Sequence, residues 1–228
     1  HTTQNVEQVH DVGQELASDN LMRGGISDPI PNEAHGSVYS ELHDRSVPES
    51  SALCGGCHDI RTPGGLHLER THEEWAGTVF SPGHATALSC GRCHMRGSDG
   101  YAADTEGAPV RRIHDHSVPA VDVALTEFPE RESQREGVQD ALDDTLFARL
   151  CIQPAAGGVN AVVRLENIGA GHSFPSGASH NRRLWVEIVA YSGDTVLMSS
   201  GVVPDDEAVL DQVDPLLWVF RDELFDAD

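Results

Sequence analysis

The sequence predicts an α+β fold, in which a loop-rich region with short helices is followed by a small antiparallel β-sandwich. Residues 51–126 are rich in glycine, histidine and proline, and their apolar residues show no sustained helical or strand period. From residue 146 onward, apolar β-rich runs alternate with turn signals. We therefore expect three parts: a first region over 1–126, a connecting helix within 127–145, and a β domain over 146–228.

Three segments before the β domain have helical character. The polar N-terminal stretch is expected to be coil with a short helix at 4–18, and "ERTHEEWAGTVF" at 69–80 predicts another short helix. The segment 130–145 predicts a surface helix, because Val138 and Leu142 are spaced to lie on one inward face. Between these segments, the pattern of apolar residues does not predict a hydrophobic core, so something else must organise the first region.

Four runs in the last part predict strands: "TLFARLCIQP", "GVNAVVRLEN", "RRLWVEIVAY" and "DTVLMSSGVV". Cys151 falls in the first of them and is expected to be a buried, inert thiol. Near the end, Leu216, Leu217, Trp218 and Phe220 lie where a further partner strand would be expected. We therefore expect the sandwich to be incomplete at its C-terminal end.

The net charge of the chain limits the classes of partner that it can bind. Fifteen basic residues, all arginine, oppose 37 acidic ones, and the formal net charge is −22. Nucleic acids and anionic membranes are poor partners for such a chain, whereas a solvated acidic surface or the steering of a basic protein fits it. No apolar run approaches the ~20 residues of a membrane helix. The start at His1 predicts a cleaved secretion signal, so we expect an exported protein, periplasmic or extracellular.

The pattern Cys-x-x-Cys-His occurs twice, thirty-six positions apart. In this pattern the two thiols form thioethers with the vinyl groups of a haem, and the histidine that follows ligates the iron. The sequence therefore predicts two covalently bound haem c groups. The residues concerned are Cys54, Cys57 and His58 in the first motif and Cys90, Cys93 and His94 in the second.

Three other uses of the cysteines are open. Two Cys-x-x-Cys pairs can bind one zinc ion, although zinc does not require a histidine after each pair. Disulfides suit an exported protein. A thioredoxin-like pair needs a strand before it and a helix after it, and neither is indicated around the first motif. The doubling of the whole five-residue pattern favours haem over all three.

An iron that only carries electrons needs a sixth ligand, and histidine is expected on both haems. Methionine is scarce, with Met22, Met95 and Met198 alone, and Met95 directly follows a motif histidine. The first candidates are His116, in a loop just after the second motif, and His172, between glycines in "GAGHSFPSG". The further candidates are His35, His43, His84 and His114, and the histidines expected on the surface are His1, His10, His67, His72 and His180.

Four stretches together resemble the exported multihaem c-type cytochromes: "SALCGGCHDI", "LERTHEEW" followed by "SCGRCHM", "HDHSVPAVDVAL" and "NIGAGHSFPSGASHNRRLWVEI". The last is similar to a "GHxxPTG…RR.W.EV" stretch in the β domain of that family. The resemblance implies a haem-bearing region before a β-sandwich, with axial ligands donated from distant loops. It supports His116 and His172 as ligands. The chain carries two attachment motifs, fewer than many relatives, and this departure weakens the case for carrying over the catalytic roles of larger members.

These features favour an electron carrier over a catalyst. Two close, six-coordinate haems would pass electrons to other redox proteins, or along copies of the chain assembled into a filament. A haem enzyme that reduces a nitrogen or sulfur oxyanion is the alternative, with Arg111 and Arg112 or Arg182 and Arg183 as anion-binding residues. A binding module in which haem is only structural is the third hypothesis.

Overall fold

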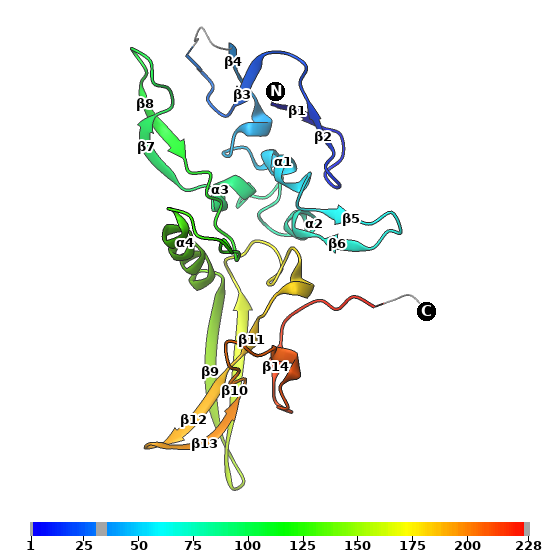
Figure 1. The fold of residues 1–228 in the computed structure, drawn as a ribbon, viewed down its shortest axis with the longest axis vertical. Coiled ribbons are helices and arrows are strands. Elements are labelled where there is room, and N and C mark those ends of the chain that lie inside the picture. The colour runs from blue at the N-terminus through cyan, green and yellow to red at the C-terminus, as the bar shows by residue number, and fades with distance from the viewer. Residues whose placement is uncertain (1, 31–35, 226–228) are drawn as a thin grey trace. The chain divides into compact units, whose positions relative to one another are not determined.

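The structure, a computed structural model, describes residues 2–30 and 36–225 (Figure 1). Within these residues, short α-helices are mixed with small strand pairs, which agrees with the predicted mixture of α and β elements. The strands pair two by two, and all pairs but one are antiparallel. The chain divides into two compact units, residues 1–174 and 175–228, and each is described by itself.

The strands of the first unit are short except in one hairpin. They are β1 (Thr3–Val6), β2 (Gln14–Leu16), β3 (Leu21–Gly24), β4 (Gly36–Tyr39), β5 (Ile60–Arg61), β6 (His67–Glu69), β7 (Gly97–Tyr101), β8 (Val110–His114), β9 (Leu146–Ala155) and β10 (Gly158–Asn167). Each pairs with its neighbour in sequence, and β3 with β4 is the parallel pair.

Four α-helices are described, all in the first unit: α1 (Ser51–Gly55), α2 (Thr71–Ala76), α3 (Cys90–His94) and α4 (Arg131–Asp143). The predicted helices near 71 and 131 are confirmed by α2 and α4. Trp75 anchors α2, because its buried indole donates to the Leu88 carbonyl at 3.0 Å, and Val138 is the buried residue of α4. Within the described residues, no helix is both long enough and apolar enough to cross a bilayer.

The predicted helix at 4–18 is wrong. These residues form β1 and β2, joined by a loop in which Asp11 and Val12 adopt φ values of 53° and 60°. A left-handed backbone at two successive residues is incompatible with a continuous helix. The loop is held by the first motif, since the Asp11 and Val12 amides donate to the carbonyls of Asp59 and Gly56. A tertiary contact therefore decides the local structure.

The hairpin of β9 and β10 confirms two predicted strands but not a sandwich. Ten residue pairs are in register, and Gly157, at a φ of +82°, provides the left-handed residue of the turn. Side chains on both faces of the hairpin are largely exposed. Cys151 is exposed as well, so the prediction of a buried thiol is wrong, because no second sheet covers this strand within its unit.

The second unit contains two further strand pairs. Its elements are β11 (Trp185–Val186) with β14 (Trp218–Val219), β12 (Ile188–Ser192) with β13 (Thr195–Ser200), and the 3₁₀ turns η3 (Ser179–Asn181) and η4 (Val209–Asp211). The Trp185 indole donates to the Gly201 carbonyl at 2.7 Å, and Val209 is buried. Trp218 is exposed, and its strand finds a partner in β11.

Few hydrophobic side chains are buried among the described residues. In the part of the chain that the structure describes they are Ala17, Trp75, Val138 and Val209. A chain of 228 residues ordinarily buries far more apolar surface than this. Whatever stabilises the native fold must therefore include more than the apolar contacts among these side chains.

Candidate functional site

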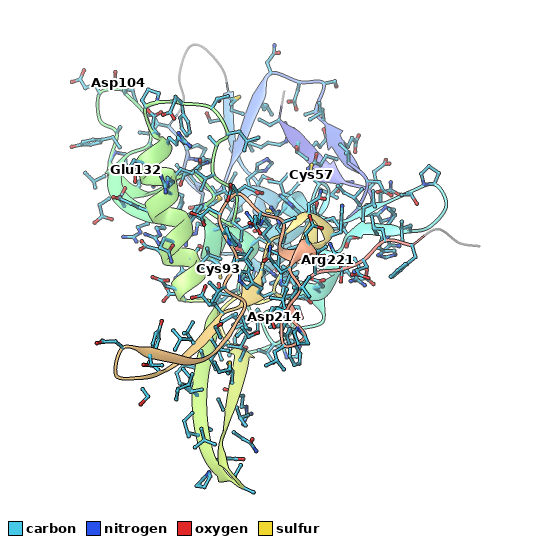
Figure 2. All side chains as sticks on the ribbon, turned by 60° about the horizontal axis from the view of Figure 1, so that its bottom comes forward. Cys57, Cys93, Asp104, Glu132, Asp214 and Arg221 are labelled. Atoms are coloured by element: carbon cyan, nitrogen blue, oxygen red, sulfur yellow. The ribbon has the colours of Figure 1, made fainter. Side chains whose placement is uncertain are left out.

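The first Cys-x-x-Cys-His motif begins in α1 and continues into the turn before β5. Cys54 lies in the helix and is half-buried, whereas Cys57 is exposed. Figure 2 labels Cys57 and, in the second motif, Cys93. Gln14, at the start of β2, reaches this turn and donates from Nε2 to the Leu53 carbonyl at 2.9 Å. The same amide lies 3.6 Å from the Cys57 sulfur. The N-terminal hairpin thus closes over the helix that carries the two thiols.

The imidazole of the first motif is exposed but fixed by a carboxylate. His58 has a side chain 62% exposed, and its Nδ1 lies 2.8 Å from Oε1 of Glu69, which is only 16% exposed. The short β5–β6 hairpin produces this approach, since Glu69 is in register with Ile60, two residues after the histidine. With Nδ1–H donating to the carboxylate, Nε2 keeps its lone pair and can bind a metal.

The second motif forms α3. Ser89 caps this helix by accepting from the Arg92 amide at 3.0 Å, and its own hydroxyl donates to the Arg45 carbonyl at 2.5 Å. The Cys90 amide donates to Ser51 Oγ, at the start of α1, at 3.0 Å. Through this bond the helices of the two motifs are held side by side, although 36 residues separate them in sequence.

Cys54 and Cys90, the first cysteines of the two motifs, lie in contact with each other. The Cys54 thiol hydrogen-bonds to Cys90, and this bond lowers the pKa of Cys90 to about 6 while it raises the pKa of Cys54. Burial raises the pKa of both residues, and Ser51 and His94 favour the Cys90 thiolate. In the haem-free chain, Cys90 is therefore the stronger nucleophile of the pair near neutral pH.

The imidazole of the second motif is held by backbone instead of a carboxylate. His94 is half-buried, and its Nδ1 lies 2.9 Å from the carbonyl oxygen of Pro119. A carbonyl can only accept, so Nδ1 carries the proton and Nε2 has the lone pair. Pro119 comes from the loop 25 residues further on, just after His116.

His172 is brought to His94. The two rings have centroids 6.4 Å apart and planes only 10° from parallel. Nδ1 of His172 donates to the Ser173 carbonyl at 2.8 Å, so its Nε2 also carries the free lone pair. Burial is the main cause that lowers the pKa of His172, which keeps the imidazole neutral at neutral pH.

The loop that carries His172 is anchored on both sides. The His172 carbonyl accepts from Asn167 Nδ2 at 2.7 Å, and the Ser173 amide donates to Glu74 Oε2 at 3.2 Å. Gly171, at a φ of +68°, sits where a Cβ atom would come within 3.3 Å of the Phe80 ring. Any other residue would be strained by this backbone conformation and would also press on the Phe80 ring.

The other predicted distal ligands are scattered. His114 ends β8 and is half-buried, with a pKa lowered first by burial and then by three arginines, and His116 lies exposed two residues beyond. His43 donates or accepts at Ser40 Oγ, 3.0 Å from Nδ1, and burial lowers its pKa. His84 is exposed in a loop. Their roles stay predictions, and His35 lies outside the described residues.

Three arginines gather beside the second motif in an otherwise acidic chain. Arg45, Arg92 and Arg112 act together to lower the pKa of His114, and Arg92 and Arg112 add to burial in lowering the pKa of Arg45. Nε of Arg45 is buried and has no hydrogen-bond partner in the structure. A cluster of cations with an orphan donor is suited to an anionic group.

Most of the arginines considered for substrate binding have partners within the protein. Arg111 pairs with Asp28 at 2.6 Å, and Arg112 lies 3.9 Å from Asp99. Arg183 donates to the backbone carbonyls of Asp205 and Glu207, and Arg182 also has a partner. Arg111, Arg182 and Arg183 thus have partners within the protein, whereas Arg112 lies near a carboxylate without a hydrogen bond to it.

The cysteines do not converge as a tetrahedral zinc site would require. The four motif sulfurs, with Cys151, are free thiols in this structure. In residues 2–30 and 36–225, the side chains that come close enough to hold a metal in a group of three or more are Asp59, His67 and Glu73. The sequence interpretation missed this group, because His67 was assigned to the surface and neither carboxylate belongs to a motif.

Two other features also escaped the sequence interpretation. His10, predicted on the surface, lies in the β1–β2 loop that bonds to the first motif, with Nδ1 2.9 Å from Asp11 Oδ2. Glu69 was not singled out, although the histidine–acid spacing "CHDIRTPGGLHLE" contains it. Comparison of the chain with protein-family models, with curated proteins and with solved structures finds no match.

Proposed function

We propose that the chain is a dihaem c-type cytochrome that transfers electrons, with His94 and His172 as the axial ligands of the second haem. The observation that carries this proposal is the pair of near-parallel imidazoles, each with Nδ1 bonded to a backbone carbonyl. One ring follows a haem-attachment pair of cysteines and the other comes from a loop 78 residues away. Both keep the lone pair of Nε2 for a metal.

The distance between the two ring centres is close to that of two imidazoles on opposite sides of one iron. A metal–imidazole bond is about 2.0 Å long and the ring centre lies roughly 1.1 Å beyond the nitrogen, so two opposite ligands have centres about 6.2 Å apart. The observed distance is 6.4 Å. An ordinary aromatic pair also falls within about 4.5–7 Å. What favours ligation is the combination of this distance with the cysteine pair and with the two oriented Nδ1 atoms.

The rest of the second site suits a porphyrin. The chain buries few hydrophobic side chains of its own among the described residues, and a haem would supply apolar surface for them to cover. The propionates of a haem are anionic, and Arg45, Arg92 and Arg112 provide cations with one unpaired donor. The residues present therefore fit the group.

Transfer between two haems is supported by the adjacency of the motifs. The Cys54 and Cys90 thiols touch, and Ser51 joins the two motif helices. Attachment points in contact hold two cofactors as neighbours, which an electron carrier needs and a single catalytic haem does not. When bound, the haem irons supply the one-electron chemistry. The chain holds the imidazoles, fixes their protons at Nδ1 and surrounds the site with charge.

The partners and the location form part of the same proposal. Other exported redox proteins, or copies of this chain in a filament, are the expected partners, and the periplasm or the cell exterior is the expected location. The acidic composition supports attraction to a basic docking surface. These points depend on the resemblance of the motifs and on the charge.

A redox titration of the purified chain tests electron transfer. We expect two low-spin haems that take up one electron each, with no change in the spectrum when nitrite or sulfite is added to the reduced protein. A high-spin component that binds these anions would contradict the proposal and support the haem enzyme.

A further inference from the structure

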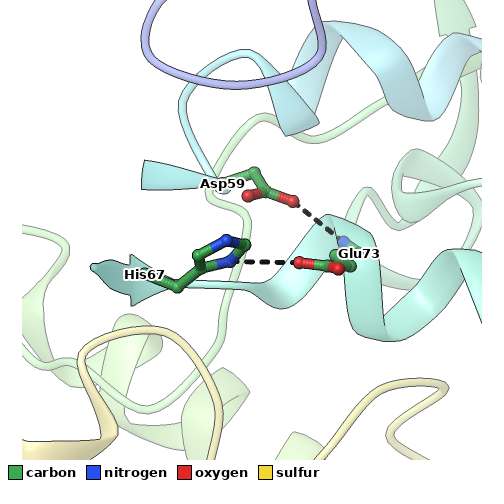
Figure 3. Close-up of side chains that lie close together, drawn as sticks. All are labelled: Asp59, His67 and Glu73. Atoms are coloured by element: carbon green, nitrogen blue, oxygen red, sulfur yellow. Dashed lines mark hydrogen bonds and ion pairs between the residues drawn. The ribbon is translucent and has the colours of Figure 1, made fainter. Parts of the chain in front are cut away.

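We infer that the chain has a second kind of metal site, formed by Asp59, His67 and Glu73, which takes a single zinc-type divalent cation. The three side chains lie close together in the structure (Figure 3). One ligand atom from each lies within 4.8 Å of one from both others. The site uses none of the residues assigned to haem binding.

The three residues are positioned by separate elements around the β5–β6 hairpin. Asp59 directly precedes β5, His67 begins β6, and Glu73 lies in α2. The Glu73 amide donates to Asp59 Oδ2 at 3.1 Å, which joins α2 to the end of the first motif. This hydrogen bond therefore holds Asp59 and Glu73 near each other without a metal.

A buried and unpartnered oxygen points to a ligand at this place. The Asp59 side chain is only 3% exposed, and its Oδ1 has no hydrogen-bond partner. Nε of Arg61 lies 3.8 Å from this oxygen, which is too far for a hydrogen bond. A buried carboxylate oxygen without a partner is costly, and a bound cation would remove that cost.

The other two ligands already stand near the spacing that a tetrahedral metal requires. Nδ1 of His67 and Oε2 of Glu73 are 3.1 Å apart, and Nδ1 is buried without a properly oriented hydrogen bond. Ligand atoms bonded to zinc at about 2.0–2.1 Å in a tetrahedron are roughly 3.3 Å apart. Closure of the Asp59 carboxylate toward this pair would complete three protein ligands, and water would take the fourth position.

The donor set selects the class of cation. One imidazole with two carboxylates suits zinc and similar transition metals, whereas calcium takes six to eight oxygen ligands. Two carboxylates and a neutral imidazole balance the two positive charges of the cation, so the occupied site carries no net charge.

The test is a calorimetric titration of zinc chloride into the purified holoprotein after treatment with a chelator. We expect one strong equivalent that excess calcium does not displace. The Asp59→Asn variant keeps an oxygen for the Glu73 amide, so the fold is retained. Changes outside the ligand shell of a metal cost about 10–100-fold in affinity, and loss of a ligand should weaken zinc binding by at least about 100-fold.

Matched controls separate this site from the other histidines and acids. Asp104→Asn and His180→Ala change residues outside the cluster, and both variants should bind zinc as the parent does. His67→Gln should reproduce the loss seen in Asp59→Asn. Equal zinc affinity in the parent, Asp59→Asn and His67→Gln would overturn the inference. The readout is heat and stoichiometry, and in the haem-loaded chain the motif cysteines are thioethers that do not compete for zinc. Because Asp59→Asn and His67→Gln leave all cysteines in place, the difference from the parent reports this site alone.

Discussion

The two Cys-x-x-Cys-His motifs have the same five-residue pattern but different surroundings. The first has an exposed histidine bonded to the Glu69 carboxylate, and no second imidazole is in ring contact with it among the described residues. The second has a half-buried histidine bonded to a backbone carbonyl, with the parallel ring of His172 beside it. The structure thus brings two imidazoles together at the second motif, whereas the distal histidine expected for the first motif stays a prediction.

The different surroundings of the two motif histidines also predict different reduction potentials for the two haems. A carboxylate on Nδ1 makes an imidazole a stronger donor than a carbonyl does, and a stronger donor stabilises the oxidised iron. The first motif has the carboxylate, and the second has three arginines nearby, which favour the reduced iron. We therefore expect the second haem to have the higher potential. Electrons that enter at the first haem would then pass downhill to the second.

The largest expected effect is the loss of a whole haem. Replacing Cys90 and Cys93 together by alanine should remove one haem mass and leave the first haem attached, and replacing Cys54 and Cys57 should do the reverse. Intact-mass measurement of each purified variant checks this. The Cys151→Ala variant is the control, since its thiol lies exposed on β9. Two haems on either double variant would break the assignment.

The next effect is a change of spin state at one iron. His172→Ala should convert the second haem from low-spin to high-spin and leave the first unchanged, because His172 is the imidazole beside His94. Electron paramagnetic resonance checks this. Near-parallel ligand planes also predict a rhombic low-spin signal for that haem in the parent.

Two variants serve as controls for the spin-state result. His180→Ala should leave both haems low-spin. His116→Ala distinguishes the sequence prediction for that residue from the structural pairing. If His116→Ala produced the high-spin signal at the second haem and His172→Ala did not, the pairing of His94 with His172 would be wrong.

The cysteines should differ in reactivity before haem is attached. The pKa of Cys90 lies near 6 and that of Cys54 is raised, because the two thiols share a hydrogen bond. Above about pH 6 Cys90 is a thiolate, so in haem-free chain alkylation of Cys90 at pH 7 should be about tenfold faster or more than alkylation of Cys54. Below pH 6 the difference should fall as Cys90 takes up its proton. Peptide mass spectrometry against time measures both rates, and equal rates at pH 7 would contradict the contact.

The smallest expected effects are shifts of potential. Glu69→Gln should raise the potential of the first haem by about 50 mV, roughly a tenfold change for one electron, because the imidazole loses its carboxylate partner. Arg45→Gln should instead lower the potential of the second haem, because it removes a positive charge that favours the reduced iron. Spectroelectrochemical titration of each variant measures the potentials of the two haems separately. A shift at the wrong haem would exchange the assignments of the motifs.

Local patterns allowed part of this fold to be predicted. The helices α2 and α4 and the strands β9 and β10 follow from spacing and composition along short stretches. The N-terminal helix was predicted wrongly, because the contacts of Asp11 and Val12 with the first motif outweigh local preference. The way that strands pair is likewise set by distant contacts, and the two-by-two pairing differs from the sheets that a sandwich requires.

The candidate site was also predictable only where a local sequence pattern defines it. The attachment cysteines and their histidines are evident from the repeated pattern, and His172 was favoured by its glycines and by the family resemblance. Glu69 and the carbonyls of Pro119 and Ser173 could not be found in this way, because a hydrogen bond to a ring nitrogen depends on how the chain folds back. The cluster around Asp59 was missed for the same reason.

The most direct test of the central claim is the intact mass of the chain, produced in cells that attach haem c and measured under denaturing conditions. Thioethers survive unfolding, whereas zinc and loosely bound haem are lost. The account predicts the mass of the polypeptide plus two haems. The polypeptide mass alone, from a colourless sample, would contradict it.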